Sequence, residues 1–164
     1  MKKKINHFYQ KPLGFTLVEL IIVMAILGLL ATVGLASFRS SQIKGRDAQR
    51  KNDLGQLQRG LEAYYNDKGR YPITVDFPSA GSPWQDTLLS GETGTLYMKE
   101  IPADPTAYDY VYWSDGTSYK IFAHLENQKD KDIVPDDCNP VRNEPCDGVN
   151  CNYGVSSANV RVCD

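Results

Sequence analysis

A long apolar stretch containing a single acidic residue lies near the N-terminus of this chain. In residues 15–38 the only charged side chain is Glu19. As a helix, this stretch is long enough to cross the roughly 30 Å hydrocarbon core of a bilayer. A carboxylate at the centre of such a helix costs about 2.5 to 3.5 kcal/mol on insertion scales, so Glu19 needs a partner. We therefore predict a single-pass membrane anchor in which Glu19 has a function.

The position of Glu19 indicates which cation could neutralise it. If the chain is cut between Gly14 and Phe15, the new α-amine lies about one helical turn before Glu19, or ~6 Å along the axis. The same amine could instead meet the Glu19 of a second copy packed alongside. The arrangement therefore suits a polymer whose subunits exchange an internal pair for an intermolecular one.

The sequence around this site resembles a known family. The class III signal of bacterial type IV pilins and type II secretion pseudopilins is similar to the segment Leu13-Gly14-Phe15-Thr16-Leu17-Val18-Glu19-Leu20-Ile21-Ile22. The resemblance implies cleavage after Gly14 by a prepilin peptidase, N-methylation of the exposed Phe15 and an assembly role for Glu19. It extends to residues 46–54, 69–72 and 101–105, and nothing familiar follows from Cys138 onward.

The pattern along the chain divides it into five segments. After the apolar stretch, Leu54, Leu57, Leu61 and Tyr64 recur at helical spacing between charged residues, so the helix continues in amphipathic form. Gly69 and the Tyr71-Pro72 pair provide the stop. We predict a leader (1–14), a transmembrane half of the helix (15–38), an amphipathic half (39–66), a globular head (67–137) and a cysteine-rich C-terminal loop (138–164).

The head is expected to add a small antiparallel sheet to the helix. Residues 108–113 and 117–125 have strand composition and flank Ser114-Asp115-Gly116, which predicts a hairpin. A third strand is expected near residues 155–162, whereas residues 73–105 have the composition of a long loop with one helical turn. The predicted fold class is α+β, and the resemblance implies a type IV pilin-like fold.

Four cysteines near the C-terminus predict disulfide bonds. Cys138, Cys146, Cys151 and Cys163 form an even set without the C-x2-C spacing of a zinc knuckle. They allow three pairings. Closing such a loop with a disulfide typically adds ~2 to 4 kcal/mol of stability, which suits a tail that we expect to bury little apolar surface. Because disulfides form in an oxidising exterior, the N-terminus should face the cytoplasm. The family resemblance also implies a C-terminal disulfide loop.

Two charged clusters are further candidate sites. Major pseudopilins carry a calcium loop at roughly the place of four aspartates here, which makes calcium a candidate although the spacing is not that of an EF-hand: Asp130, Asp132, Asp136 and Asp137. No cofactor is otherwise required. The basic residues of 44–51 alternate with acidic ones and are expected to form a solvated or intersubunit face.

Composition and motifs exclude two classes of function. A net charge of -2 and a pI near 5.7 argue against a dedicated nucleic-acid binder. The two histidines form no Ser/His/Asp or Cys/His arrangement, so we expect no enzyme.

The predicted function is a structural pilin that polymerises into a type IV pilus-like filament. The first alternative is a major pseudopilin of a type II secretion system, and the second is a secreted or anchored binding module with a signal-like N-terminus. The resemblance implies other copies of the chain, a prepilin peptidase, an assembly ATPase and a platform protein as partners. The expected location is the inner membrane, then a cell-surface filament.

Overall fold

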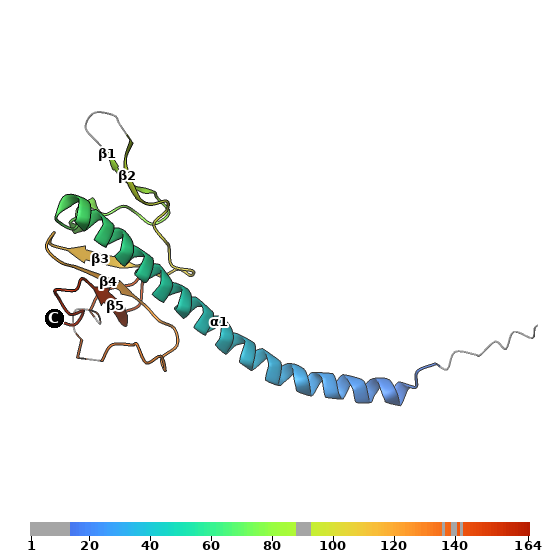
Figure 1. The fold of residues 1–164 in the computed structure, drawn as a ribbon. Coiled ribbons are helices and arrows are strands. Elements are labelled where there is room, and N and C mark those ends of the chain that lie inside the picture. Colours follow the sequence, from blue (N-terminus) through green and yellow to red (C-terminus); the bar gives the residue numbers. More distant parts are fainter. Residues whose placement is uncertain (1–13, 88–92, 136, 139–140, 142) are drawn as a thin grey trace, which may run out of the picture. The chain divides into compact units, whose positions relative to one another are not determined.

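The chain is described by a computed structural model that covers residues 14–87, 93–135, 137–138, 141 and 143–164. One long helix is followed by two small antiparallel sheets, which confirms the α+β fold class (Figure 1). The elements are α1 (Leu17–Lys68), a short 3-10 helix η1 (Thr74–Asp76), β1 (Trp84–Thr87), β2 (Thr93–Met98), β3 (Val111–Ser114), β4 (Tyr119–Ala123) and β5 (Tyr153–Ser156). One sheet pairs β1 with β2, and the other has the order β3-β4-β5.

The chain consists of two compact units, residues 1–40 and residues 41–164, and α1 runs through both. Among the described side chains of the N-terminal unit, the large apolar ones are exposed, from Phe15 at 84% to Val23 at 46%. Contiguous apolar surface of this extent is rare on soluble monomers and marks a surface that a membrane or a partner covers. Among the described residues, α1 is the one helix long and apolar enough to cross a membrane.

The C-terminal unit is built on the amphipathic half of α1. Leu54, Leu57 and Leu61 are at most 2% exposed and pack with Tyr119 and Ile121 of β4. Burying a leucine side chain contributes about 1.5 to 3 kcal/mol, so this stripe supplies much of the stability. The helix ends before Gly69, which has the positive φ of 70° that suits a residue after a helix C-terminus.

The predicted hairpin between residues 108 and 125 is confirmed as β3 and β4. Ser114 pairs with Tyr119 across the turn, and Gly116 there has φ of 89°. The Asp115 carboxylate accepts hydrogen bonds from the backbone N–H groups of Thr117 and Ser118, at 2.8 and 2.9 Å. These bonds lower the pKa of Asp115 to about 2. The turn is therefore specified by an Asx-type arrangement and a glycine.

Residues 73–105 contain the expected helical turn as η1, but the expectation of a long loop is wrong, because this segment also contains the β1–β2 hairpin. Trp84 on β1 is buried against the aromatic rings of Tyr64, Phe77 and Tyr97. The Gly, Ser and Thr content that indicated a loop also occurs in short strands. The packing of one tryptophan against α1 outweighs that local preference.

The cysteine-rich tail covers the second face of the β3-β4-β5 sheet, and this corrects the expectation that it buries little. Phe122 on β4 is 2% exposed and packs with Val134 and Val141 and with three of the cysteines, Cys138, Cys146 and Cys151. The third strand, expected near residues 155–162, is β5 and ends at Ser156. The sheet thus has a core on each face.

Gly154 is required where β5 crosses Phe122. A Cβ atom at this position would lie 2.9 Å from Phe122 Cδ1 and 3.1 Å from both Ile121 O and Val162 Cγ2. We expect Gly154→Ala to lower the free energy of unfolding by about 1 to 3 kcal/mol through overpacking. Gly55→Ala is a matched control, because the added methyl group would meet only Arg59, at 3.8 Å. Since alanine favours the helix more than glycine does, this variant should raise the free energy of unfolding by up to ~1 kcal/mol. Urea unfolding of both variants measures the difference, and equal stabilities would contradict this account.

Candidate functional site

The first candidate site is the start of α1. Glu19 N–H donates to Thr16 Oγ1 at 3.2 Å, while Thr16 N–H donates to Glu19 Oε2 at 3.4 Å. This reciprocal pair is a capping box, in which two backbone N–H groups at the helix start are satisfied by side chains. The sequence expectations did not include it, although the Thr-x-x-Glu spacing is its signature. The Glu19 carboxylate is thereby held at the helix N-terminus.

Gly14 and Phe15 immediately precede this capping box. Both residues are exposed, and neither belongs to the helix, which begins at Leu17. The peptide bond between them therefore lies in exposed backbone outside the helix, which a peptidase could reach. The rest of the predicted leader, residues 1–13, lies outside the described residues. Cleavage here, methylation of Phe15 and the pairing of Glu19 with the new amine remain predictions.

The second candidate site is a buried charge cluster around Arg50. Its side chain is fully buried and forms ion pairs with Asp47 at 2.8 Å, Asp104 at 2.7 Å and Glu126 at 2.8 Å. Arg46 Nε donates to Glu126 Oε1 at 2.8 Å. The expectation of a solvated or intersubunit face is therefore wrong for Asp47 and Arg50, which are buried. The helical spacing turns them toward the loops that follow β2 and β4.

The charges of this cluster stabilise one another. Burial opposes the charge on Arg50, but hydrogen bonds to Asp104 and Glu126 raise the pKa of its guanidinium. Hydrogen bonds from Arg46 and then from Arg50 lower the pKa of Glu126 to about 2. Burial would raise the pKa of Asp104, but bonds from Arg50 and Thr106 lower it. The carboxylates of Asp104 and Glu126 therefore stay ionised, and the cluster joins α1 to both loops.

These lowered pKa values predict acid sensitivity of the C-terminal unit. Because the pKa of Glu126 falls from 4.5 to about 2 on folding, its contribution is complete above pH 4.5 and is lost as the pH falls toward 2. The lowered pKa of Asp104 likewise makes the folded unit less stable as the pH falls. Burial raises the pKa of Asp53, which has the opposite effect on stability. Urea midpoints should therefore decrease between pH 4.5 and pH 2. A midpoint that rises over this range would contradict the prediction.

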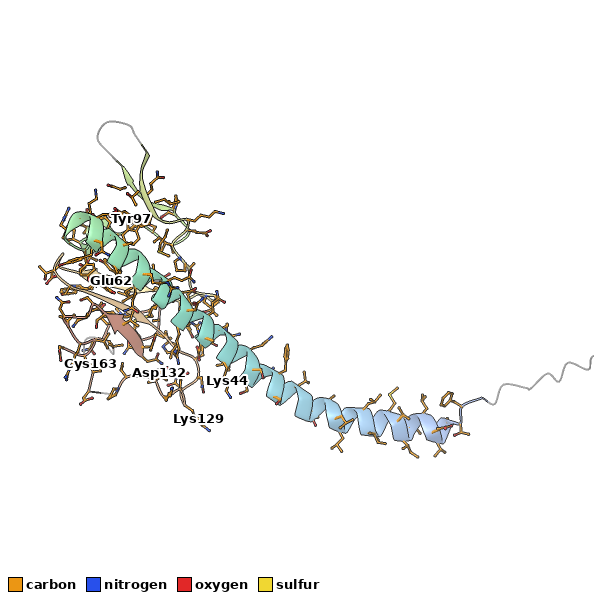
Figure 2. All side chains as sticks on the ribbon, viewed as in Figure 1. Lys44, Glu62, Tyr97, Lys129, Asp132 and Cys163 are labelled. Carbon is orange, nitrogen blue, oxygen red and sulfur yellow. A yellow bond between two sulfur atoms is a disulfide. The ribbon has the colours of Figure 1, made fainter. Side chains whose placement is uncertain are left out.

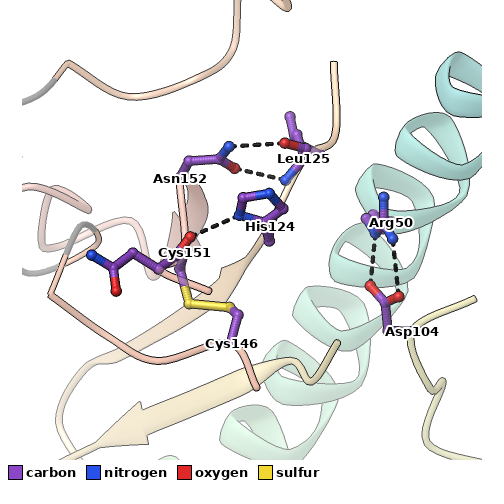
Figure 3. The surroundings of a disulfide bond; sticks show 8 residues. Arg50, Asp104, His124, Leu125, Cys146, Cys151 and Asn152 are labelled. Atoms are coloured by element: carbon purple, nitrogen blue, oxygen red, sulfur yellow. Dashed lines mark hydrogen bonds and ion pairs between the residues drawn. A yellow bond between two sulfur atoms is a disulfide. The ribbon is translucent and has the colours of Figure 1, made fainter. Parts of the chain in front are cut away.

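The third candidate site is the disulfide-bonded tail. Cys138 is joined to Cys163 across 25 residues, and Cys146 is joined to Cys151 across five. Figure 3 shows the second bond beside His124, whose Nδ1 is 2.7 Å from the carbonyl oxygen of Asn150. Asn152 is buried, and its amide donates to Leu125 O and accepts from Leu125 N–H. The disulfides thus close the tail on itself, and hydrogen bonds attach it to the residues that follow β4.

The four aspartates predicted as calcium ligands do not share one environment. Asp130 and Asp132 both contact the ammonium of Lys51, at 2.6 and 2.7 Å. Asp137 is exposed, and Asp136 lies outside the described residues. Among the residues that the structure describes, no three His, Cys, Asp or Glu side chains gather as a metal site would require. A cation from the protein, the Lys51 ammonium, therefore lies between the two carboxylates of Asp130 and Asp132, and calcium binding by these aspartates stays a prediction.

Comparison with known proteins identifies relatives over most of the chain. The prokaryotic N-terminal methylation motif matches residues 10–35. The type II secretion system core protein G of Escherichia coli (strain K12) is 30% identical over 108 residues, which cover 65% of this chain and 74% of the relative. The core protein G of Klebsiella pneumoniae is 32% identical over 65% of this chain and 78% of its own length.

A pilin is also among the relatives. The type IV major pilin protein PilA of Myxococcus xanthus is 32% identical over 68 residues, which cover 42% of this chain and 31% of PilA. No solved structure matches the chain. The relatives include both kinds of protein that the N-terminal segment resembles.

Proposed function

Because the chain belongs to the type IV pilin and type II secretion pseudopilin family, whose members are structural filament subunits and not enzymes, we propose that it is the pilin of a surface filament. The observation that carries this proposal is the start of α1. An accessible Gly14–Phe15 bond precedes a carboxylate held at the N-terminus of an exposed apolar helix. Cleavage would place an amine beside Glu19, and packing of helices would cover the apolar surface.

The proposal includes a route from membrane to filament. Residues 15–38 anchor the processed chain in the inner membrane, with the N-terminus in the cytoplasm and the disulfide-bonded unit outside. Copies then leave the bilayer as their apolar helix faces pack together, and Glu19 pairs with the amine of its own or an adjacent copy. A prepilin peptidase, an assembly ATPase and a platform protein would act on the chain.

A type II secretion pseudopilin is the second candidate function. Its support is that both core protein G relatives are matched over about three quarters of their own length, whereas PilA is matched over 31%. The pilin is favoured by the tail, which adds a disulfide-closed layer to the sheet. The family relationship gives no support to an unrelated binding module.

Deletion of the gene separates the two functions. For a pilin, surface filaments that react with antibody to residues 41–164 should disappear from electron micrographs, while secreted enzymes still reach the medium. Restoring the chain should restore the filaments. Loss of secretion with unchanged surface filaments would overturn the pilin proposal and favour the pseudopilin.

A further inference from the structure

The loop that follows β4 is attached to α1 at two places. The two attachments come from Asp47 and Lys51, which lie one helical turn apart. At its start, Asp47 accepts hydrogen bonds from the backbone N–H groups of Glu126 and Asn127, at 3.0 and 2.9 Å. At its end, the Lys51 ammonium contacts Asp130 Oδ1 at 2.6 Å and Asp132 Oδ2 at 2.7 Å. Figure 2 labels Lys129 and Asp132 on this loop. The helix therefore supplies both attachments of the loop.

Lys51 is partly enclosed by its partners. Its side chain is 25% exposed, that of Asp130 is 17% exposed, and the ammonium lies 5.8 Å from the centre of the Tyr153 ring on β5. The backbone N–H of Asp132 donates to Asp130 Oδ1 at 3.0 Å, which curls the loop around the lysine. Two carboxylates this close repel each other unless a cation lies between them. The ammonium satisfies that requirement with one oxygen from each aspartate.

The same position would be poor for a divalent metal. Calcium takes six to eight oxygen ligands at about 2.3 to 2.6 Å, whereas two carboxylates approach Lys51 and its own positive charge would repel a second cation. Asp137 is exposed and makes no contact with Lys51 among the described interactions. The Lys51 ammonium is covalently attached to α1, so it is present at the loop whatever the ion concentration of the medium, whereas a bound metal ion is not.

We propose that Lys51 is the permanent cation of this loop, so that the C-terminal unit folds and holds residues 126–132 against α1 without calcium. The inference goes beyond filament formation, since it concerns the folded state of each single copy. It also assigns residues 130 and 132 to a helix attachment in place of the metal site suggested by the sequence. Removal of the ammonium should leave two facing carboxylates without a cation.

The experiment uses the full-length, oxidised chain in detergent, in EGTA and in CaCl2. Lys51→Ala is compared with Lys44→Ala, an exposed lysine earlier on the same helix. Thermal unfolding reports the whole C-terminal unit, and limited trypsin digestion reports the loop, because trypsin cleaves after Lys129 and Lys131, which are both exposed. Cleavage sites are identified by peptide mass.

For the unaltered chain, we expect the same Tm and the same slow loop cleavage in EGTA and in CaCl2. Lys51→Ala in EGTA should lower the Tm by about 2 to 8 °C and speed cleavage after Lys129 and Lys131 several-fold, whereas Lys44→Ala should change neither.

Two results would overturn the proposal. One is a rise in the Tm of the unaltered chain with calcium that disappears in Asp130→Asn, which would show that the aspartates bind the metal. The other is a Lys51→Ala chain that matches Lys44→Ala in both Tm and loop cleavage in EGTA. Neither result depends on whether filaments form, because both are measured on single copies.

Discussion

Replacing Arg50 with leucine is expected to remove a large part of the free energy of unfolding of the C-terminal unit. The substitution removes the cation from three carboxylates, those of Asp47, Asp104 and Glu126. Breaking a buried ion pair by removing one partner costs about 3 to 5 kcal/mol. Domains of this size are stable by only about 5 to 15 kcal/mol. Urea unfolding of the full-length chain, followed by fluorescence of Trp84 and Trp113, measures the loss.

Two further variants separate charge from geometry at this position. Arg59→Leu removes an exposed arginine from the same helix and should change stability by less than about 0.5 kcal/mol. Arg50→Lys keeps the charge but loses the planar fork that bonds Asp104 through two nitrogens, so it should be intermediate. An Arg50→Leu chain as stable as Arg59→Leu would show that the cluster does not stabilise the fold.

Replacing Glu19 with alanine is expected to abolish filament assembly while membrane insertion persists. Insertion should be unaffected, because removing a carboxylate from an apolar helix lowers the cost of burial in the bilayer. Assembly should fail, because the freed amine of Phe15 would then have no acidic partner in the packed helices. Membrane fractionation measures insertion, and electron microscopy of sheared surface material measures filaments.

Glu19 has a second role that a matched variant can separate from the first. Its carboxylate also caps the helix by accepting from Thr16 N–H, and glutamine at this position of a capping box can do the same. Glu19→Gln therefore retains the cap but not the charge. We expect it to assemble as poorly as Glu19→Ala. Normal filaments from Glu19→Gln would show that capping, and not charge pairing, is what assembly requires.

Several features were predictable because their determinants are close in sequence. The β3–β4 hairpin depends on Asp115 and Gly116 between two runs of strand residues, and the helix end depends on Gly69. The capping box of Thr16 and Glu19 was equally local, and its spacing was available from the sequence. These signals involve residues within one or two turns of each other, where elementary backbone chemistry decides the outcome.

Other features depend on residues that are far apart. Arg50 pairs with Asp104 and Glu126 across 54 and 76 residues, and a helical pattern cannot show which charges meet across such distances. The sequence likewise allowed three pairings of the four cysteines, and the pairing of Cys138 with Cys163 depends on how the tail packs over Phe122. The β1–β2 hairpin was hidden by its turn-forming composition and is held by Trp84. In each case tertiary packing supplies information that local patterns lack.

The central claim is that assembly uses an amine created at Phe15 to neutralise Glu19. The most direct test is mass spectrometry of the N-terminal peptide from subunits of purified surface filaments. The account predicts a chain that begins at Phe15 and carries one methyl group on its α-amine. Subunits that retain residues 1–14, or that begin downstream of the apolar stretch, would lack this amine and contradict the claim.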